Sequence, residues 1–187
     1  MNGLLISLGI LLIVIIWAIS KYNLFVKLRN NRENAFADID VQLKQRHDLI
    51  PQLVATVKGY ASHEKETLDM VVSARAGAMN ARSIDEKIVA ENALSSALAG
   101  LKVTVEAYPD LKANTNFLHL QEEISDIENK LAAVRRYFNS ATKELNTAIE
   151  MFPANIIAGM FGFRKEMMFD LGGSERKTME QAPQISF

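Results

Sequence analysis

The feature that most constrains this chain is an uncharged apolar run near its amino-terminal end. From Gly3 to Ile19 the sequence reads GLLISLGILLIVIIWAI, without a charged side chain. As an α-helix, an apolar run of ~17 to 25 residues crosses the ~30 Å hydrocarbon core of a bilayer. Trp17 and Tyr22 stand where aromatic side chains favour the membrane interface, and Lys21 follows the run as a charged stop. We therefore expect residues 1–20 to form a single-pass transmembrane anchor.

The flanks of the run bear on its fate and orientation. The run exceeds the apolar part of an ordinary signal peptide and no basic segment precedes it, which favours a retained anchor over a cleaved signal. The residues before the run, Met1 and Asn2, carry no basic side chain, whereas four basic residues follow it before the first acid, which predicts that the bulk of the chain faces the cytoplasm. The alternative is an extracytoplasmic bulk, because a basic cluster can also bind lipid headgroups. The four basic residues are Lys21, Lys27, Arg29 and Arg32.

The composition argues against two kinds of chemistry. The chain has 21 basic and 22 acidic residues and a net charge of -1, spread along its length. This distribution leaves no basic face for sustained phosphate contact, so nucleic acid is not an expected partner. The sequence contains no cysteine, which excludes disulfides and thiolate chemistry.

The clearest periodicity after the anchor is an apolar seam in which residues recur in steps of three and four. Such a seam predicts one long helix that packs along its length, as in a coiled coil or an elongated bundle. Asn114 or Thr115 can cap its start, and Pro153 marks its end. The seam comprises Phe117, Leu120, Ile124, Ile127, Leu131, Val134, Phe138, Ala141, Leu145, Ala148 and Phe152.

Two further helices are expected upstream of this seam. One follows a looser apolar stripe from Leu43 to Val71, treated as a single continuous helix. The other begins with Ser83 and Glu86, which have the spacing of a capping box, and ends before Pro109. Short connections favour antiparallel neighbours. The sequence thus predicts an all-α fold, with a transmembrane helix followed by an elongated antiparallel bundle of three long helices and a short C-terminal helix.

The expected domain organisation follows from these lengths. The first helix, taken from Lys21 onward, is longer than its partners, and its excess must project. We expect an anchor at 1–20, a polar helical stalk at 21–38 that lifts the bundle or packs against neighbouring stalks, a bundle at 39–170, and a polar, mobile tail at 171–187.

A dense apolar segment follows Pro153. Phenylalanine and methionine crowd into it, and such surfaces either cover the end of a bundle or form adaptable contacts with a partner. At the end of the chain, Ile185 and Phe187 have the alternation by which a carboxyl terminus is captured as an added strand, so they are a candidate tail ligand. The candidate interaction or oligomer interface comprises Ile156, Ile157, Met160, Phe161, Phe163, Met167, Met168 and Phe169.

Four sequence segments carry a family resemblance. The run YNLFVKLRNNRENAFADIDVQLKQRHDLIPQLVATVKGYASHEKETLDMVVSARAGA, Tyr22 to Ala78, closely resembles the signature of the LemA family of bacterial membrane proteins. The resemblance continues from Ala107 to Asn139, from Met151 to Phe163 and in the terminal PQISF, so it covers almost the whole chain. One departure is Phe36, where the family commonly has Trp.

The resemblance implies an amino-terminal membrane helix and an elongated helical bundle at the bacterial inner membrane. It implies no known reaction. Some relatives are linked to membrane remodelling in magnetosome formation, and others occur alongside HtpX-like membrane metalloproteases.

The residues themselves offer little catalytic chemistry. The pair His63-Glu64 opens like a zinc-protease helix, but Thr67 stands where the second ligand histidine of H-E-x-x-H belongs. The paired carboxylates fit solvated helix faces. We therefore expect no enzyme activity, no metal and no cofactor. The remaining polar positions suggest an interhelical network that fixes register, or a surface for a partner; the candidate network comprises His47, Glu64, Gln121, Glu128 and Arg135.

Two functions remain. The first is a membrane-tethered, non-enzymatic scaffold that contacts lipid and forms a homo-oligomer through its long seams, stalks and Phe/Met-rich segment, in membrane organisation or remodelling. The alternative is an adaptor or regulator of a membrane protein partner, such as an HtpX-like metalloprotease.

Overall fold

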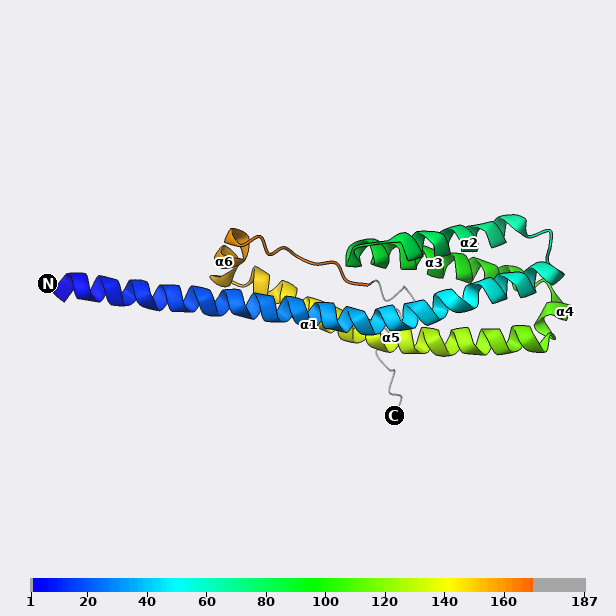
Figure 1. The fold of residues 1–187 in the computed structure, drawn as a ribbon, viewed down its shortest axis with the longest axis horizontal. Helices are drawn as coiled ribbons and strands as arrows, with labels where there is room; N and C mark the ends of the chain where they lie inside the picture. Colours follow the sequence, from blue (N-terminus) through cyan, green and yellow to red (C-terminus); the bar gives the residue numbers. More distant parts are fainter. Residues whose placement is uncertain (1, 170–187) are drawn as a thin grey trace, which may run out of the picture. The chain divides into compact units, whose positions relative to one another are not determined.

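Residues 2–169 are described by a computed structural model of the chain. Over this range every regular element is an α-helix, which confirms the predicted all-α fold (Figure 1). In chain order the helices are α1 (Asn2–Tyr60), α2 (Lys65–Asn80), α3 (Ile84–Val105), α4 (Pro109–Lys112), α5 (Thr115–Glu150) and α6 (Ala154–Met160). The described residues divide into a first unit, built from residues 2–37 and 137–168, and a second unit, residues 38–136 with Phe169. Both long helices, α1 and α5, contribute to both units.

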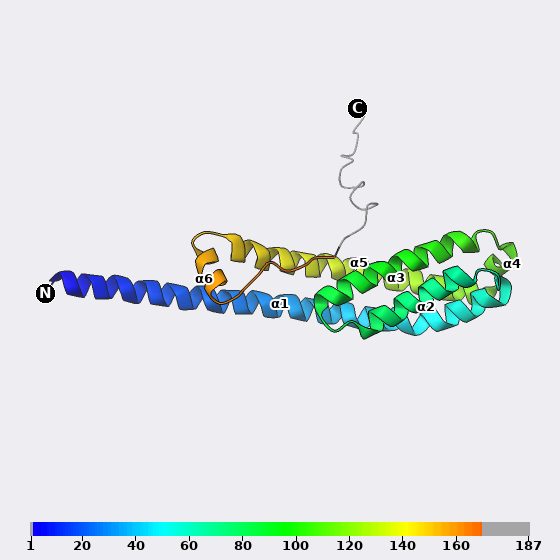
Figure 2. The same ribbon diagram turned by 90° about the horizontal axis from the view of Figure 1, so that it is seen from above.

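The second unit is an antiparallel bundle of four helical segments. The carboxyl-terminal part of α1 runs beside α2, α3 and the amino-terminal part of α5, and consecutive segments run in opposite directions (Figures 1 and 2). Apolar side chains from every segment and from α4 meet in one core, as the amphipathic spacing of each helix requires. The best-buried members are Val57, Val71, Leu94, Leu111, Ile50 and Ala61.

The bundle contains a turn that the sequence did not predict. The stripe from Leu43 to Val71 was expected to be one helix, but α1 ends at Tyr60 and α2 begins at Lys65. Ala61 and Leu68 lie on opposite sides of this turn and both enter the same core. A spacing of three and four residues is unchanged when a chain turns back into the same core, so periodicity alone could not reveal the break.

The predicted helix caps are present. The Ser83 Oγ accepts a hydrogen bond of 3.1 Å from the Glu86 backbone N–H, and a Glu86 carboxylate oxygen accepts one of 3.3 Å from the Ser83 N–H. These two bonds form a capping box at the start of α3. At the start of α5, the Phe117 N–H donates to the Asn114 Oδ1 at 2.9 Å.

The first unit pairs α1 with the carboxyl-terminal part of α5, and α6 packs against both. Its core consists of Phe25, Leu28, Leu145, Ile149, Ala154, Ile157 and Ala158. Residues 21–38 were expected to form a polar, projecting stalk, but Phe25, Arg32 and Phe36 are buried there. The expectation was wrong because the seam of α5 extends far enough to cover this part of α1.

The same packing buries most of the long apolar seam of α5. Within this chain the seam residues from Phe117 to Ala148 are buried or half-buried, and the last seam residue, Phe152, which lies beyond the end of α5, is strongly exposed. The seam was expected to leave apolar surface for a second copy. Because α1 is long enough to follow α5, the seam supplies little surface of that kind.

Within residues 2–169, two helices are long and apolar enough to cross a membrane, judged by length and composition: α1 and α3. In α1 the leucines and isoleucines from Leu4 to Ile19 are exposed, and within the apolar run only Trp17 and Ala18, near its end, are half-buried against the first unit's core. In α3 the inner face is buried in the second unit's core. The amino-terminal run of α1, with its exposed apolar side chains, is therefore the stronger candidate for a membrane span.

Candidate functional site

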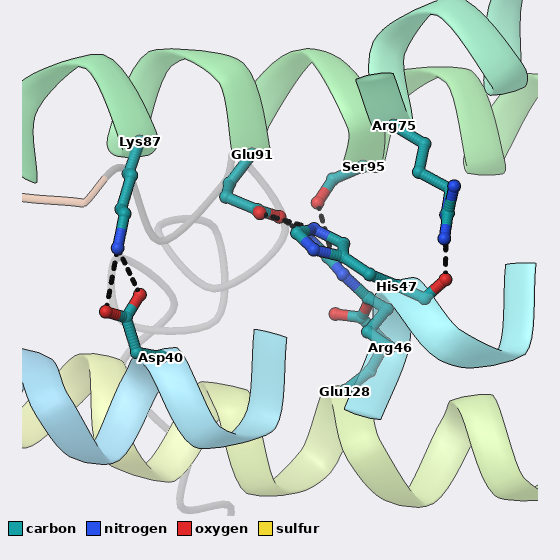
Figure 3. Close-up of polar contacts among 8 residues, drawn as sticks. All are labelled: Asp40, Arg46, His47, Arg75, Lys87, Glu91, Ser95 and Glu128. Atoms are coloured by element: carbon teal, nitrogen blue, oxygen red, sulfur yellow. Dashed lines mark hydrogen bonds and ion pairs between the residues drawn. The ribbon is translucent and has the colours of Figure 1, made fainter. Parts of the chain in front are cut away.

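The second unit buries charged side chains in addition to its apolar core. Arg46 of α1 is 0% exposed, although arginine is almost never fully buried without partners. Its Nη1 donates to the Glu128 carboxylate of α5 at 2.6 Å and to the Ser95 Oγ of α3 at 3.1 Å. Its Nη2 forms a short ion pair with the Glu91 carboxylate of α3. Arg46 thus joins three helices (Figure 3).

Glu91 is the matching buried acid. Its other carboxylate oxygen lies 2.7 Å from the His47 Nε2, so adjacent residues of α1 hold both oxygens. Burial acts to raise the pKa of Glu91, but the hydrogen bond with His47 and the positive charge of Arg46 together lower it below the 4.5 of a free glutamate. The carboxylate is therefore ionised at neutral pH. We call Arg46, Glu91, His47, Glu128 and Ser95 the polar centre.

Further charged groups surround the polar centre. The Arg75 Nε of α2 donates to the His47 backbone carbonyl at 2.8 Å, and this bond connects α2 with α1. On the α1–α3 surface, the Lys87 ammonium lies 2.7 and 2.8 Å from the two Asp40 carboxylate oxygens. Figure 3 shows both contacts flanking the centre.

Arg135 of α5 is a partly buried cation near the polar centre, and its hydrogen bonding is incomplete within the described part of the chain. Burial and repulsion from Arg46 lower its pKa, and the charges of Glu128 and Glu91 offset part of that shift. Its guanidinium lies 5.0 Å from the centroid of the Phe169 ring, and its Nε and Nη2 have no hydrogen-bond partner within the described part of the chain.

The chemistry available to the polar centre is structural. Arg46 cannot act as a base, and the Glu91 carboxylate is held on both oxygens by cationic or hydrogen-bonding groups. A buried pair of this kind accepts only the helix register that brings its partners together, since any shift leaves a charge without a partner in the core. The arrangement therefore specifies how α1, α3 and α5 align.

The predicted polar network is only partly assembled. His47 and Glu128 belong to the polar centre, and Arg135 lies within its electrostatic reach. Glu64 lies instead at the α1–α2 turn, where the Tyr108 hydroxyl donates to it at 2.9 Å and has its pKa raised by that bond. Gln121 is exposed on α5.

The candidate network did not include Arg46, Ser95 or Glu91, and of these three Glu91 is the hardest to expect from the sequence. It lies in a stretch that the family resemblance did not cover, and glutamate is ordinarily a surface residue. The available signal was its place on the apolar stripe of α3, three residues after Ile88 and three before Leu94, both of which are buried.

An apolar groove of about 670 Å³ runs between α3 and α5 in the second unit. Leu98, Val105, Phe117 and Ile124 form its floor and walls. Lys102, Glu106, Lys112, Gln121 and Glu122 place charge and polarity along its length, and Ser95 and Glu128 connect it with the polar centre. Pockets of this size and polarity accommodate a ligand or a few side chains of a partner.

The outer face of α3 is a second unusual surface. Exposed residues recur in steps of four and three along it and none is charged: Val89, Ala93, Ser96, Gly100 and Val103. Val103 is 75% exposed, and a side chain added at Gly100 would meet open space. We call these five residues the α3 outer stripe. It explains why α3 is as apolar as a membrane span although its inner face already lies in a core.

The predicted Phe/Met-rich interface divides between core and surface. Ile157 and Phe169 are buried, and Phe163 is half-buried against Tyr22 and Phe25. Ile156, Met160, Phe161, Met167 and Met168 are exposed. The segment thus does both things that its composition suggested: it covers the α1–α5 pair and presents apolar side chains outward. The candidate tail ligand, Ile185 and Phe187, lies outside the described residues.

The histidines are separate from one another. His63 is exposed in the α1–α2 turn, His119 lies 3.6 Å from the Glu123 carboxylate on α5, and His47 belongs to the polar centre. Over residues 2–169 there is no group of three or more histidine, aspartate or glutamate side chains that could hold a metal ion.

Comparison with known proteins gives a family match and several distant relatives. A model of the LemA family matches residues 35–187. Protein LemA of Metamycoplasma hominis is 26% identical over 160 residues, which cover 84% of this chain and 73% of that protein. Magnetosome protein MamQ of Magnetospirillum gryphiswaldense is 23% identical over 175 residues, and Magnetosome protein MamQ 2 of Paramagnetospirillum magneticum is 22% identical. Each magnetosome match covers 80% of this chain and 64% of the relative, less than two thirds of its length.

Proposed function

This chain belongs to the LemA family, and we propose that it is a membrane-tethered, non-enzymatic scaffold that assembles with copies of itself. The exposed apolar run of α1 and the family membership make it a membrane-associated protein. In the proposal the run crosses the bacterial inner membrane once, with the bulk on the cytoplasmic side because basic residues follow the run. The magnetosome relatives favour a role in organising or remodelling that membrane.

The observation that carries self-association is the α3 outer stripe. Small side chains at Ala93, Ser96 and Gly100 permit close approach of a second helix, and Val89 and Val103 can interdigitate beside it. An exposed, uncharged face about four turns long is a typical contact surface. Two copies can pair it about a twofold axis, because the same stripe then serves both partners.

The polar centre supports this proposal indirectly. It fixes the register of α1, α3 and α5, so the stripe is presented on a rigid bundle. A rigid, preorganised face loses less conformational entropy on binding than a flexible one. In this proposal the charged groups contribute to assembly by fixing the helix register, and they have no catalytic role.

The test is the mass of the full-length protein in mild detergent, measured by mass photometry. We expect a discrete oligomer for the natural chain. The double variant Ser96→Glu, Gly100→Glu should shift the mass toward the monomer, because it places two charges on the stripe where space is open for the new side chains.

The matched control is Ser73→Glu, Gly77→Glu on α2. These two positions have the same residue types and the same spacing of four, both are exposed, and Gly77 also faces open space. This variant should keep the natural mass. A natural chain that is monomeric, or a stripe variant that keeps the oligomer, would overturn self-association through α3. If the natural protein is monomeric in detergent and lipid shields the stripe in vesicles, the stripe contacts the bilayer instead.

A second candidate function is an adaptor for a membrane enzyme such as an HtpX-like metalloprotease. The observation that favours it is the groove between α3 and α5, whose apolar floor and polar rim suit a segment of a partner.

Co-purification of the two full-length proteins from detergent tests the adaptor function. Leu118→Lys places a charge at the groove, where the native leucine is 49% exposed, and should reduce recovery of the enzyme. Val72→Lys on α2, where valine is 50% exposed, should leave recovery unchanged. Equal recovery with both variants, or recovery that depends on residues 184–187 alone, would exclude the groove as the binding surface.

A further inference from the structure

α6 is fixed at the end of the apolar run of α1. Its buried residues Ala154, Ile157 and Ala158 share a core with Phe25, and Trp17 and Ala18 pack against that core. Both ribbon views show α6 beside α1, next to the blue amino-terminal segment (Figures 1 and 2). All these residues belong to the first unit.

Aromatic contacts hold the turn after α6 at the same level. The Tyr22 ring lies 4.8 Å from the Phe161 ring and 5.9 Å from the Phe163 ring, and the Phe25 and Phe163 rings are 5.2 Å apart. Gly162 adopts a φ of 74°, and the Phe163 N–H donates to the Ala158 carbonyl at 3.0 Å. This helix end is a Schellman motif, and it turns Phe163 back onto α1.

The other face of α6 and its flanks is apolar and uncovered. Phe152 is 80% exposed and Met160 is 73% exposed, and Ile156, Phe161 and Met151 are also exposed. Exposing aromatic and large aliphatic side chains to water is unfavourable, and a group of such exposed side chains is typical of a contact surface. We call Met151, Phe152, Ile156, Met160 and Phe161 the α6 apolar face.

We propose that the α6 apolar face lies in the membrane interface and is a second lipid contact of this chain, beside the transmembrane helix. The inference rests on the span assigned to α1 under the proposed function and is independent of self-association. If residues 3–19 cross the bilayer, Trp17 and Tyr22 stand at its edge, about 8 Å apart along the helix. The headgroup region on each side of the hydrocarbon is itself about 5 to 8 Å thick. A segment packed on Trp17, Ala18 and Tyr22 therefore lies in that region.

The surroundings fit a lipid surface better than a second copy of the chain. The core beneath the α6 apolar face also contacts Trp17 and Ala18, so this face lies at the level where the exposed apolar run of α1 ends. Lys27 and Arg164 are exposed close by in sequence to the packed residues Phe25 and Phe163, so cations accompany the apolar side chains. Apolar residues flanked by cations are typical of segments that lie in the interface plane, buried ~5 to 10 Å deep.

The test uses depth-dependent fluorescence quenching of the full-length protein in phosphatidylcholine–phosphatidylglycerol vesicles whose acyl chains carry bromine near the headgroup or deep in the hydrocarbon. Trp17 is the chain's single tryptophan, so the natural protein reports the depth of the anchor. The variant Trp17→Phe, Phe161→Trp reports α6. We expect shallow bromine to remove most of the emission at position 161 and deep bromine to remove much less.

The matched control is Trp17→Phe, Tyr137→Trp. Tyr137 belongs to the same unit and is 54% exposed, against 57% for Phe161, but its hydroxyl lies 3.5 Å from the Asn31 Oδ1. Asn31 follows Ile19 by about 18 Å of helix, well beyond the headgroup region. Emission at position 137 should be unquenched by either lipid.

The outcomes separate the inference from its premise. Quenching at Trp17 without quenching at 161 would leave the anchor intact and overturn the lipid contact, and a blue-shifted but unquenched emission at 161 would assign the face to a second copy. Equal quenching at 161 and 137 would overturn the assigned depth. A natural protein whose Trp17 is unquenched would refute the membrane span itself.

Discussion

The two units solve the same packing problem with different chemistry. In the first unit, α1 and α5 meet through aromatic and aliphatic side chains, and the buried cation Arg32 lies 3.1 Å from the Glu166 carboxylate and 5.0 Å from the Phe138 ring centroid. In the second unit, Arg46 and Glu91 meet inside the bundle. Apolar contacts stabilise in proportion to area and tolerate similar shapes, whereas a buried ion pair tolerates neither a missing partner nor a shifted register.

This comparison predicts that removal of one charge has the largest effect in the molecule. Arg46→Met should destabilise the second unit by about 3 to 5 kcal/mol, because Glu91 remains buried without its main cation. Replacing both residues, Arg46→Met with Glu91→Leu, should recover most of that loss, since apolar groups of similar volume can replace a buried pair. Hydrogen exchange of α3 measures both effects in the full-length protein. A double variant as unstable as the single one would mean that the pair contributes through its bonds to Ser95 and Glu128.

The first unit should lose stability when a buried side chain in its apolar core is shortened. Ile157→Ala removes buried atoms between α6 and α1 and should cost about 2 kcal/mol in local stability, at the low end for such changes because the side chain lies near the edge of its core. The neighbouring Ile156→Ala changes an exposed residue and should stay within about 0.5 kcal/mol of the natural chain. Hydrogen exchange across α6 distinguishes the two variants. Equal effects would show that α6 is not seated by Ile157.

The units should also differ in acid sensitivity. Because the folded pKa of Glu91 lies below that of the unfolded chain, its contribution is fully present above about pH 4.5 and is lost as the pH falls through the lowered value. We expect this loss to be smaller than that of Arg46→Met, since Arg46 keeps Glu128 and Ser95.

Denaturation of the full-length protein between neutral pH and about pH 3 tests this difference. The natural chain should lose more stability than Arg46→Met, Glu91→Leu, whose second unit lacks the pair. Glu86 and Glu106 have pKa values lowered by the Arg82 and Ser83 backbone N–H groups and by Lys112, so both proteins retain some acid sensitivity. Parallel pH profiles for the two proteins would contradict the expectation that ionised Glu91 stabilises the second unit.

The smallest expected effect is at the end of α6. Gly162→Ala should destabilise the Schellman turn by about 1 kcal/mol, because an L-residue is disfavoured at a φ of 74°. Gly159→Ala, one turn earlier inside α6 and facing open space, should instead stabilise the helix by about 0.5 to 1 kcal/mol. Chemical denaturation monitored by Trp17 emission measures both. Two changes of the same sign would mean that α6 is held by its core contacts alone.

Some of these features followed from sequence alone. The apolar run, the capping box at Ser83, the Asn114 cap and the seam of α5 are local or periodic patterns, and each indicates its element without knowledge of the partners. The same patterns, with the family resemblance, gave the all-α fold and the candidate polar residues His47, Glu128 and Arg135. They could not give the partner of Arg46, because Glu91 lies 45 positions away and reads locally as a surface glutamate.

What the sequence determined by itself is therefore the set of helices and the membrane-associated character of the chain, since both depend on the spacing of apolar residues along one segment. Only the tertiary structure decided that α1 turns back at Ala61, that residues 21–38 pack against α5, that Arg46 pairs with Glu91, and that α6 lies beside Trp17. These outcomes depend on which surfaces meet across long chain separations. Packing and the cost of burying an unpaired charge select that arrangement, and neither is written in any local pattern.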